Sequence, residues 1–538
     1  MGVTEQLIMF VLEQFTFTTA VLFFTFLFVI YITKYFLYLR SLPPGPTGIP
    51  IFGSLLSFKK PFHLQMYDFA QQYGKLMSVR MGSQLVVVIN DVNLLKKAFS
   101  QHEFTARPKS VLDSICQGYG LITSDGALWK SQRSFIHKHK FGLKFWGNIG
   151  DQMEQRVSHE VLCCLTAIHN GSKYTEDVGT KNLGIDPSAY LSCSISNVIC
   201  SIIMSTRFKH GEERFKQFIQ FFDEGFRLFK LTGVMMFLPF IKMFPAMSEV
   251  CNKLKKNREE LLNFVAEIIE EHKRSLDSKS PRDLVDSYLL EIEKTRENGT
   301  TEEVFQSKEP EVQLQQVLVD LFSAGFETVK TTLLWTIIHM LRNPEIKRKV
   351  QEELERVVGG NRLPCLDDMS RLNYSRACIY ESMRRSLAVP LGTTHSNTRP
   401  VSLEGHTIPE NSHVVPNLYA IHMDPEAWEN PEEYNPERFL DSEGNLVKPK
   451  QFIPFGTGQR MCLGDKLAET ELQLFFTSIL HVFDIEAIGD VPSLDGNLGA
   501  TLTPNQFNVN FVERNLDALI SANTKAKPTY SQFMRTYG

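Results

Sequence analysis

The feature that most constrains this chain is a cysteine placed between glycines near the C-terminal end, in the run Phe455-Gly-Thr-Gly-Gln-Arg-Met-Cys-Leu-Gly464. Gly458 and Gly464 allow positive φ angles and close backbone approach, so neighbouring N–H groups can point at a thiolate. A thiolate held in this way suits the axial position of a haem iron, where it favours O–O cleavage. The loop therefore predicts a haem-thiolate site with Cys462 as the iron ligand.

The alternative for this loop is an ordinary buried cysteine in a turn. It is disfavoured because the loop has five fixed positions, each holding a residue type used at roughly a twentieth of positions, and these coincide by chance in far less than about one chain in a thousand. The pattern F-x-x-G-x-R-x-C-x-G resembles the haem-binding loop of the cytochrome P-450 superfamily at every fixed position. The resemblance implies haem b as the cofactor and Cys462 as its proximal ligand. Four further residues of the loop are expected to contact this cofactor: Phe455, Gly456, Arg460, which stands where a propionate needs a cation, and Gly464.

A Pro-free run from Glu311 to Asn343 is apolar on all sides, which predicts a long and largely buried helix. Three of its side chains fall on one stripe at i, i+4 spacing: Asp320, Ala324 and Thr328. Gly325 beside an inward hydroxyl is expected to open the helical hydrogen-bond ladder locally. Glu327 and Thr328 then supply an acid and an alcohol for delivering protons to bound oxygen. The alternative is a packing notch at the glycine, with the threonine bonded back to its own helix.

Glu381 and Arg384 resemble the ExxR pair of the same superfamily, and Arg438 in a following Pro-Glu-Arg-Phe run is expected to close a structural triad. The same spacing recurs at Glu293/Arg296 and Glu353/Arg356, where exposed helical ion pairs are expected. The position of Glu381 upstream of the thiolate loop selects it. The triad is predicted to hold that loop in place.

Three upstream residues are predicted to contact the haem propionates. Trp129 and Arg133 lie one helical turn apart, so an indole N–H and a guanidinium share a face. His395 resembles a family histidine with the same role. Core packing for the tryptophan and an ordinary satisfied histidine are the alternatives.

The N-terminal segment predicts a membrane anchor. Residues 15–33 carry no charge and are rich in Phe, Leu, Val and Ile, and together with the following residues they are long enough to span a bilayer. Lys34 and Arg40 follow the span, whereas Glu5 and Glu13 precede it, which places the C-terminal side in the cytosol. A cleaved signal peptide is disfavoured because a basic n-region and a small-residue cleavage site are lacking.

The predicted organisation is a membrane anchor over residues 1–40, a Pro-rich hinge over 41–50, a haem-thiolate catalytic domain over 51–519 and a polar C-terminal tail over 520–538. Apolar runs at Leu85–Ile89 and Phe507–Phe511 are expected strands within a mostly helical pattern. The expected fold class is therefore mainly α with small β-sheets. The resemblance implies the cytochrome P-450 fold, preceded by one transmembrane helix.

The net charge and the cysteine content indicate which partners and which cellular compartment to expect. A net charge of −4 gives no reason to expect a nucleic-acid partner, and nine scattered cysteines without a C-x-x-C grid favour a reducing compartment. The expected location is the endoplasmic reticulum membrane, with the domain facing the cytosol. No flavin or nicotinamide domain is recognisable, so electrons from NADPH must arrive through a separate reductase, with cytochrome b5 as a possible second donor. Four lysines form the expected docking patch, a solvated basic face being the alternative: Lys130, Lys138, Lys140 and Lys450.

The substrate pocket is expected to be apolar with a few polar groups, because a Phe-rich helix precedes the apolar run Val234–Phe240. Six residues are predicted to line it: Asp320, Ser323, Ala324, Val389, Leu391 and Leu502. Three segments are similar to the insect ecdysteroid 26-hydroxylases, which predicts side-chain hydroxylation of a steroid moulting hormone: Ser196–Phe208, Asp283–Lys294 and Asp320–Thr336. A broad xenobiotic or fatty-acid hydroxylase is the alternative within the family. A thiolate-haem isomerase or a haem-based gas sensor is disfavoured by the acid–alcohol pair and by the lack of a signalling domain.

Overall fold

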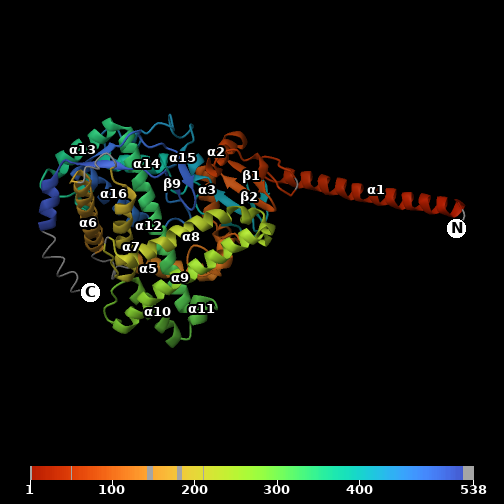
Figure 1. The fold of residues 1–538 in the computed structure, drawn as a ribbon, viewed down its shortest axis with the longest axis horizontal. Helices are drawn as coiled ribbons and strands as arrows, with labels where there is room; N and C mark the ends of the chain where they lie inside the picture. Colours follow the sequence, from red (N-terminus) through yellow and green to blue (C-terminus); the bar gives the residue numbers. More distant parts are fainter. Residues whose placement is uncertain (1–2, 50, 142–148, 178–183, 210, 525–538) are drawn as a thin grey trace.

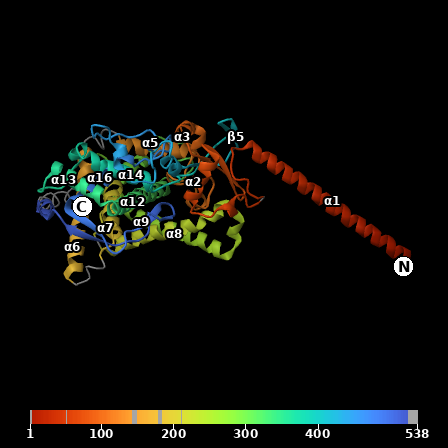
Figure 2. The same ribbon diagram turned by 90° about the horizontal axis from the view of Figure 1, so that it is seen from above.

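The computed structural model describes residues 3–49, 51–141, 149–177, 184–209 and 211–524. One long helix, α1 (Val3–Ser41), projects as a rod from a helix-rich body, and a quarter turn of the molecule shows the same separation (Figures 1 and 2). Its stretch Phe17–Ser41 is long and apolar enough to cross a membrane, and only 6% of its membrane-length apolar window is buried against the rest of the protein. A second helix of similar hydropathy, α7 (Pro187–Met204), is 67% buried and belongs to the core.

The centre of the body is α12 (Pro310–Arg342), which confirms the predicted long helix. Pro310 suits the first turn, where its missing N–H costs nothing, and Pro344 stops the helix after Asn343. Buried residues occupy all sides of α12 because neighbouring helices surround it, including α7, α14 (Asn373–Arg385) and α16 (Asp465–Val482). Two antiparallel helices, α8 (Glu213–Phe237) and α9 (Pro245–Ser275), pack against each other beside it.

The other helices complete the body around this centre. They are α2 (Phe62–Tyr73), α3 (Val92–Phe99), α4 (Val111–Cys116), α5 (Gly126–Phe141), α6 (Ile149–Asp177), α10 (Leu284–Glu297), α11 (Thr301–Phe305), α13 (Pro344–Val358) and α15 (Leu418–His422). Short 3-10 helices lie at Leu55–Ser57, His102–Thr105, Pro239–Met243, Leu366–Ser370 and Pro436–Phe439.

Small sheets account for the β-structure. The largest has four strands in the order β1-β2-β6-β3, with β2 and β6 parallel and the other pairs antiparallel. Three antiparallel pairs accompany it, β7 with β10, β4 with β5 and β8 with β9. The strand bounds are β1 Leu76–Met81, β2 Gln84–Ile89, β3 His395–Ser396, β4 Val401–Leu403, β5 His406–Ile408, β6 His413–Pro416, β7 Phe483–Ala487, β8 Gly496–Leu498, β9 Leu502–Pro504 and β10 Val509–Glu513.

These elements confirm the expected class, mainly α with small sheets. The predicted strand Leu85–Ile89 is β2, whereas the C-terminal strand lies two residues beyond the predicted Phe507–Phe511, where Val509 and Phe511 are buried against β7. A final helix over residues 516–524 crosses the predicted boundary at residue 519 because Ala518 and Leu519 pack into the core. Residues 525–538 of the predicted tail lie outside the described part of the chain.

Candidate cofactor and active site

The predicted cysteine lies in a loop that leads directly into α16. The N–H of Cys462 donates to the carbonyl of Phe455 at 3.0 Å, and the N–H of Gly464 lies 3.3 Å from the cysteine sulfur. Gly458 has a φ of +77°, and a Cβ on it would lie 2.2 Å from the carbonyl oxygen of Phe99. Close approach therefore requires glycine at 458, as predicted. The positive φ expected at Gly464 was wrong, since its φ is −98°; its contribution is the N–H directed at sulfur.

A cavity of about 320 Å³ opens on this loop and reaches α12, with Ala324 and Thr328 in its wall together with Cys462. A second cavity of about 190 Å³ shares these three residues and continues towards Ile136 and Leu467. The two cavities therefore form one slot between α12 and the cysteine loop. The exposed sulfur of Cys462 and the apolar walls are what a flat, apolar macrocycle with a metal at its centre requires.

One end of this slot carries three guanidinium groups. Arg460 donates to the carbonyls of Thr105, Leu121 and Ser124, and its guanidinium lies 4.0 Å from the Trp129 ring centre. Arg107 donates to two further carbonyls, and Arg133 donates to the carbonyl of Met461 at 2.6 Å. All three line the cavity, and among the described residues none of them forms an ion pair with a carboxylate.

The lowered pKa values of two of these arginines show that nearby negative charge does not balance their positive charges. Burial, and then the neighbouring charge of Arg107, lower the pKa of Arg460 to about 8, an effect that the Asp125 carboxylate offsets in part. Burial and the charge of Arg133 lower the pKa of Arg107 to about 10. Two haem propionates would supply the missing negative charge, so these residues fit the predicted cofactor.

His395 and Trp129 complete that end of the slot. Burial, and then Arg107, lower the pKa of His395 to about 3, and its Nδ1 donates to the carbonyl of Phe104 at 2.7 Å. Nε2 is therefore the ring nitrogen available to a ligand, and it would donate to a propionate only in the protonated ring, a form that the negative charge of a propionate favours. The indole N–H of Trp129 has no acceptor among the described residues, which suits a propionate oxygen.

The catalytic pair predicted on α12 is divided by the structure. Thr328 lines both cavities and donates to the carbonyl of Ala324 at 2.7 Å. Glu327 lines neither; its carboxylate forms a buried ion pair with Lys330 at 2.6 Å and accepts from Thr501 at 3.4 Å. The helix runs unbroken through Gly325, where a Cβ would lie 2.6 Å from the side chain of Ile199, so the packing notch and the threonine back-bond both exist in place of the expected opening.

Asp320 lines the larger cavity, but its carboxylate is hydrogen-bonded to the protein backbone and is not free to bind a substrate. Its Oδ2 accepts from the backbone N–H groups of Leu121 and Ile122 at 2.7 and 2.9 Å. Gln313, about two turns away on α12, bonds both backbone groups of Gly120. Together these side chains clamp the loop 119–125, whose carbonyls in turn bind Arg107 and Arg460. Burial raises the pKa of the Asp320 carboxyl, against the lowering effect of these hydrogen bonds.

The predicted triad is assembled. Arg384 donates to both carboxylate oxygens of Glu381 at 2.7 and 2.8 Å, and both side chains are fully buried. Arg438 lies 3.4 Å from the same carboxylate. The expected exposed pair at Glu353 was wrong, because that buried carboxylate accepts from the backbone N–H and hydroxyl of Ser375 at the start of α14.

Of the predicted substrate residues, Asp320, Ala324 and Val389 line the larger cavity, whereas Ser323, Leu391 and Leu502 do not. Leu391 packs against the strands β1 and β2, and Leu502 packs against Trp335. Sequence reasoning missed Arg107, Thr332 and Thr393, which line the same cavity. Arg107 lies far from any motif in the sequence, so no neighbouring residues indicate that it lines the cavity.

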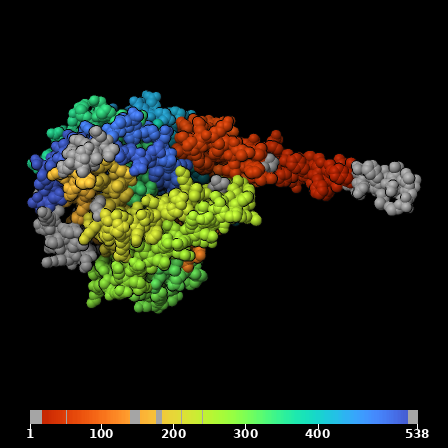
Figure 3. Space-filling view, viewed as in Figure 1, coloured from red at the N-terminus to blue at the C-terminus, as the bar shows by residue number. Residues whose placement is uncertain are grey.

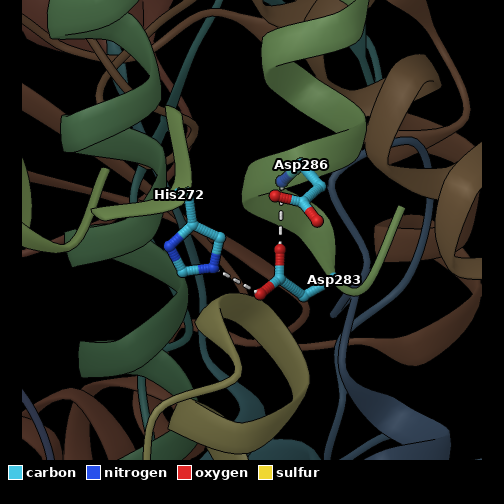
Figure 4. A group of neighbouring side chains, drawn as sticks. All are labelled: His272, Asp283 and Asp286. Atoms are coloured by element: carbon cyan, nitrogen blue, oxygen red, sulfur yellow. Dashed lines mark hydrogen bonds and ion pairs between the residues drawn. The ribbon is translucent and has the colours of Figure 1, made fainter. Parts of the chain in front are cut away.

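A second cluster of metal-ligand types lies between α9 and α10, made of His272, Asp283 and Asp286 (Figure 4). Its atoms already have partners: His272 bonds Asp283 at 2.7 Å and the carbonyl of Ile268 at 2.8 Å, and Arg282 binds both oxygens of Asp286. Asp283 also caps α10 by accepting from the N–H of Asp286. The cluster is a clasp between two helices.

Comparison with known proteins agrees with this geometry. The family profile described as Cytochrome P450 matches residues 43–511. Cytochrome P450 18a1 of Drosophila melanogaster is 48% identical over 476 residues, covering 88% of this chain and 87% of that protein. Cytochrome P450 2B19 of Mus musculus is 34% identical over 482 residues, covering 88% and 94%, and Cytochrome P450 2U1 of Homo sapiens is 32% identical over 509 residues, covering 88% and 90%. The chain belongs to the cytochrome P450 family, whose members are haem-iron oxygenases.

Proposed function

We propose that this protein inserts one oxygen atom from O2 into a hydrophobic substrate, with electrons supplied by NADPH through a separate reductase. The observation that carries the proposal is the slot in which Cys462 and Thr328 line the same cavity, and at one end of which stand three arginines that form no ion pair with a carboxylate in the described part of the chain. When bound there, haem iron activates dioxygen. Cys462 would hold the iron, and Arg107, Arg133, Arg460 and His395 would hold the propionates.

The protein's own residues control protons and water in this slot. Thr328 donates its one hydroxyl proton to the carbonyl of Ala324, so its oxygen accepts on the side of the slot, and it would donate a proton there only after rotating away from that carbonyl. Glu327 must leave Lys330 before its carboxylate can take part, so the ion pair restricts proton delivery. The apolar walls keep bulk water from competing with the substrate.

The proposed substrate is an ecdysteroid moulting hormone hydroxylated at carbon 26. The proposal is supported by the three segments that resemble the insect enzymes and by a cavity with apolar walls and a few hydroxyls, such as Thr332 and Thr393. A broad xenobiotic or fatty-acid hydroxylase is the second candidate, supported by the same apolar walls.

The test is expression of the full chain in microsomes with reductase and NADPH, followed by a mass screen of steroids for the gain of one oxygen. Ecdysteroids should gain the mass of one oxygen atom, and only when NADPH is present. Cys462→Ala should lose both this product and the thiolate-type absorption of the reduced, CO-bound haem, because the sulfur ligand is gone. Retention of spectrum and turnover in this variant would refute the proposed ligand. Oxidation of fatty acids or drugs without ecdysteroids would assign the second candidate.

We further propose that α1 anchors the protein in the endoplasmic reticulum with the catalytic domain in the cytosol. Several exposed apolar side chains lie on the α8–α9 connection, at the end of the body nearest to the root of α1 (Figure 3): Phe240, Met243 and Phe244. This position suits contact with the lipid surface, from which hydrophobic ligands would enter the protein. Lys130, Lys138 and Lys450 are exposed and stay candidates for docking the reductase or cytochrome b5; the side chain of Lys140 lies outside the described part.

Orientation has a direct test in sealed microsomes. Because positive charges follow the span, added protease should digest the domain after Pro43. Endoglycosidase should leave the mass unchanged, although Asn170, Asn298 and Asn373 stand in acceptor sequences. A protected, glycosylated domain would mean the opposite orientation.

A further inference from the structure

An arginine that pairs with no carboxylate among the described residues stands where α1 meets the body. Arg80, on the edge strand β1, places its guanidinium 5.3 Å from the ring centre of Tyr35. Tyr35 is only 6% exposed, whereas Phe28 and Leu37 on the same helix are 62% and 59% exposed, so Tyr35 marks the point of contact. Arg80 Nε and the Tyr35 hydroxyl are both buried without a hydrogen-bond partner among the described residues.

The backbone around this arginine is held rigidly. The N–H of Ser54 donates to the carbonyl of Arg80 at 2.6 Å, and the neighbouring Ser78 bonds Pro43 and Pro44 of the hinge. A Cβ on Gly53 would lie 2.0 Å from the Arg80 carbonyl oxygen, so only glycine allows the loop to lie so close. The position of the guanidinium relative to the anchor is therefore fixed by the fold.

The depth of this site follows from the length of the span. About 20 helical residues cross the hydrocarbon of a bilayer, and the charge-free run 15–33 has about this length, so the helix leaves the hydrocarbon close to Tyr35. Tyr31, Tyr35 and Tyr38 occupy this level, as aromatic side chains do at the headgroup boundary. The loop beside Arg80 carries exposed apolar side chains that favour the same boundary: Ile49, Ile51, Phe52 and Leu56.

An arginine charge at that level requires an anion, and among the described residues no carboxylate pairs with Arg80. The anion that is present at this depth is the phosphate of a phospholipid, whose oxygens a guanidinium binds bidentately. We propose that Arg80 and Tyr35 form a binding site for the phosphate group of a membrane phospholipid. The bound lipid fastens the catalytic domain to the root of its anchor. Only the choice of the cytosolic leaflet rests on the orientation proposed above.

The test uses the full chain in detergent, titrated with phosphatidic acid and examined by native mass spectrometry. One phosphatidic acid should be retained, and diacylglycerol with the same acyl chains should not be, because it differs only by the phosphate. Arg80→Gln should weaken binding by at least about tenfold, and Arg80→Lys by less, since the charge remains. Tyr35→Phe, which keeps the ring, should weaken binding about fivefold through loss of the hydroxyl. Lys59→Gln, an exposed lysine of the same region, should change nothing.

Retention of phosphatidic acid by Arg80→Gln at the parent affinity would overturn the site. Equal loss in Lys59→Gln would show a nonspecific charge effect, and displacement of the lipid by an equal concentration of inorganic phosphate would show a free-anion site; either result also overturns the proposal. The CO-bound absorption of each variant reports that the fold is intact. Failure of this test leaves the proposed orientation untouched, because binding in detergent does not depend on topology.

Discussion

At the scale of single residues, the structure separates two side chains that the sequence places together. Thr328 faces the cofactor slot, whereas the neighbouring Glu327 is directed to Lys330 and Thr501. Adjacent positions on a helix point about 100° apart, so adjacency in sequence does not mean a shared site. The hydroxyl is therefore the better supported of the two proton-handling groups.

Thr328→Ala should leave haem and substrate binding nearly intact and impair coupling, because the methyl group replaces a hydroxyl that guides a proton. NADPH would still be consumed, with more of it appearing as hydrogen peroxide and less as product. Thr332→Ala is the matched control: that hydroxyl makes the same bond to the carbonyl one turn back and lines the larger cavity, but it does not line the second cavity, which Thr328 shares with Cys462. NADPH, peroxide and product should be measured together with one substrate. Equal product per NADPH in Thr328→Ala and the parent would remove Thr328 from the mechanism.

At the scale of elements, α14 packs against the 3-10 helix Pro436–Phe439, and together they carry the buried triad that is predicted to support the cysteine loop. Glu381 and Arg384 are wholly buried, and Arg384 also donates to the carbonyls of His422 and Pro431. A buried pair adds little net stability, but breaking it leaves an uncompensated charge inside the protein. This support therefore fixes geometry more than it adds stability.

Arg384→Ala should lower the free energy of unfolding by about 3–5 kcal/mol and abolish stable haem loading, because Glu381 is left buried with only the longer contact to Arg438 to offset its charge. The neighbouring Arg385→Ala is the control, since Arg385 pairs with the exposed Glu432 and should cost under about 1 kcal/mol. Chemical unfolding and the haem-to-protein ratio measure both effects. Similar losses in the two variants would contradict a special role for the buried pair.

The sequence was most informative about elements that carry a motif. The cysteine loop, α12 and the triad were all predicted because their residues stand at fixed spacings. Arg107, Gln313 and the clamp on the loop 119–125 were not, since they depend on contacts between segments about 200 positions apart. Asp320 was expected to contact a substrate, but its carboxylate binds backbone N–H groups. Backbone partners cannot be recognised from the residue types in a sequence.

At the scale of the whole molecule, buried neutral histidines link stability to pH. Burial, and then nearby arginines, lower the pKa of His339 and of His422 to about 3, from an ordinary value of 6.5. Between these values the unfolded chain binds more protons than the folded one. The stability from these histidines is thus fully present above about pH 6.5 and is lost progressively as the pH falls towards 3.

The parent should therefore unfold more easily at each step of acidification from about pH 6.5 to 4, and each such histidine should contribute a slope of up to about 1.4 kcal/mol per pH unit. His339→Gln removes one titrating group and retains a partner for the Ser386 hydroxyl, so its slope should be smaller by about that amount. Unfolding at a series of pH values measures both slopes. An unchanged slope in the variant would show that His339 does not titrate on unfolding.

The three unpaired arginines have a consequence for how the protein is made. A newly synthesised chain without cofactor has to close the slot against its own electrostatic repulsion, whereas a chain that has captured haem closes on a dianion. A group that binds only the folded chain stabilises it by mass action. We therefore expect the supply of haem in the cell to influence how much of the protein matures and how much is degraded, so that the cofactor would act on folding before it acts in oxidation.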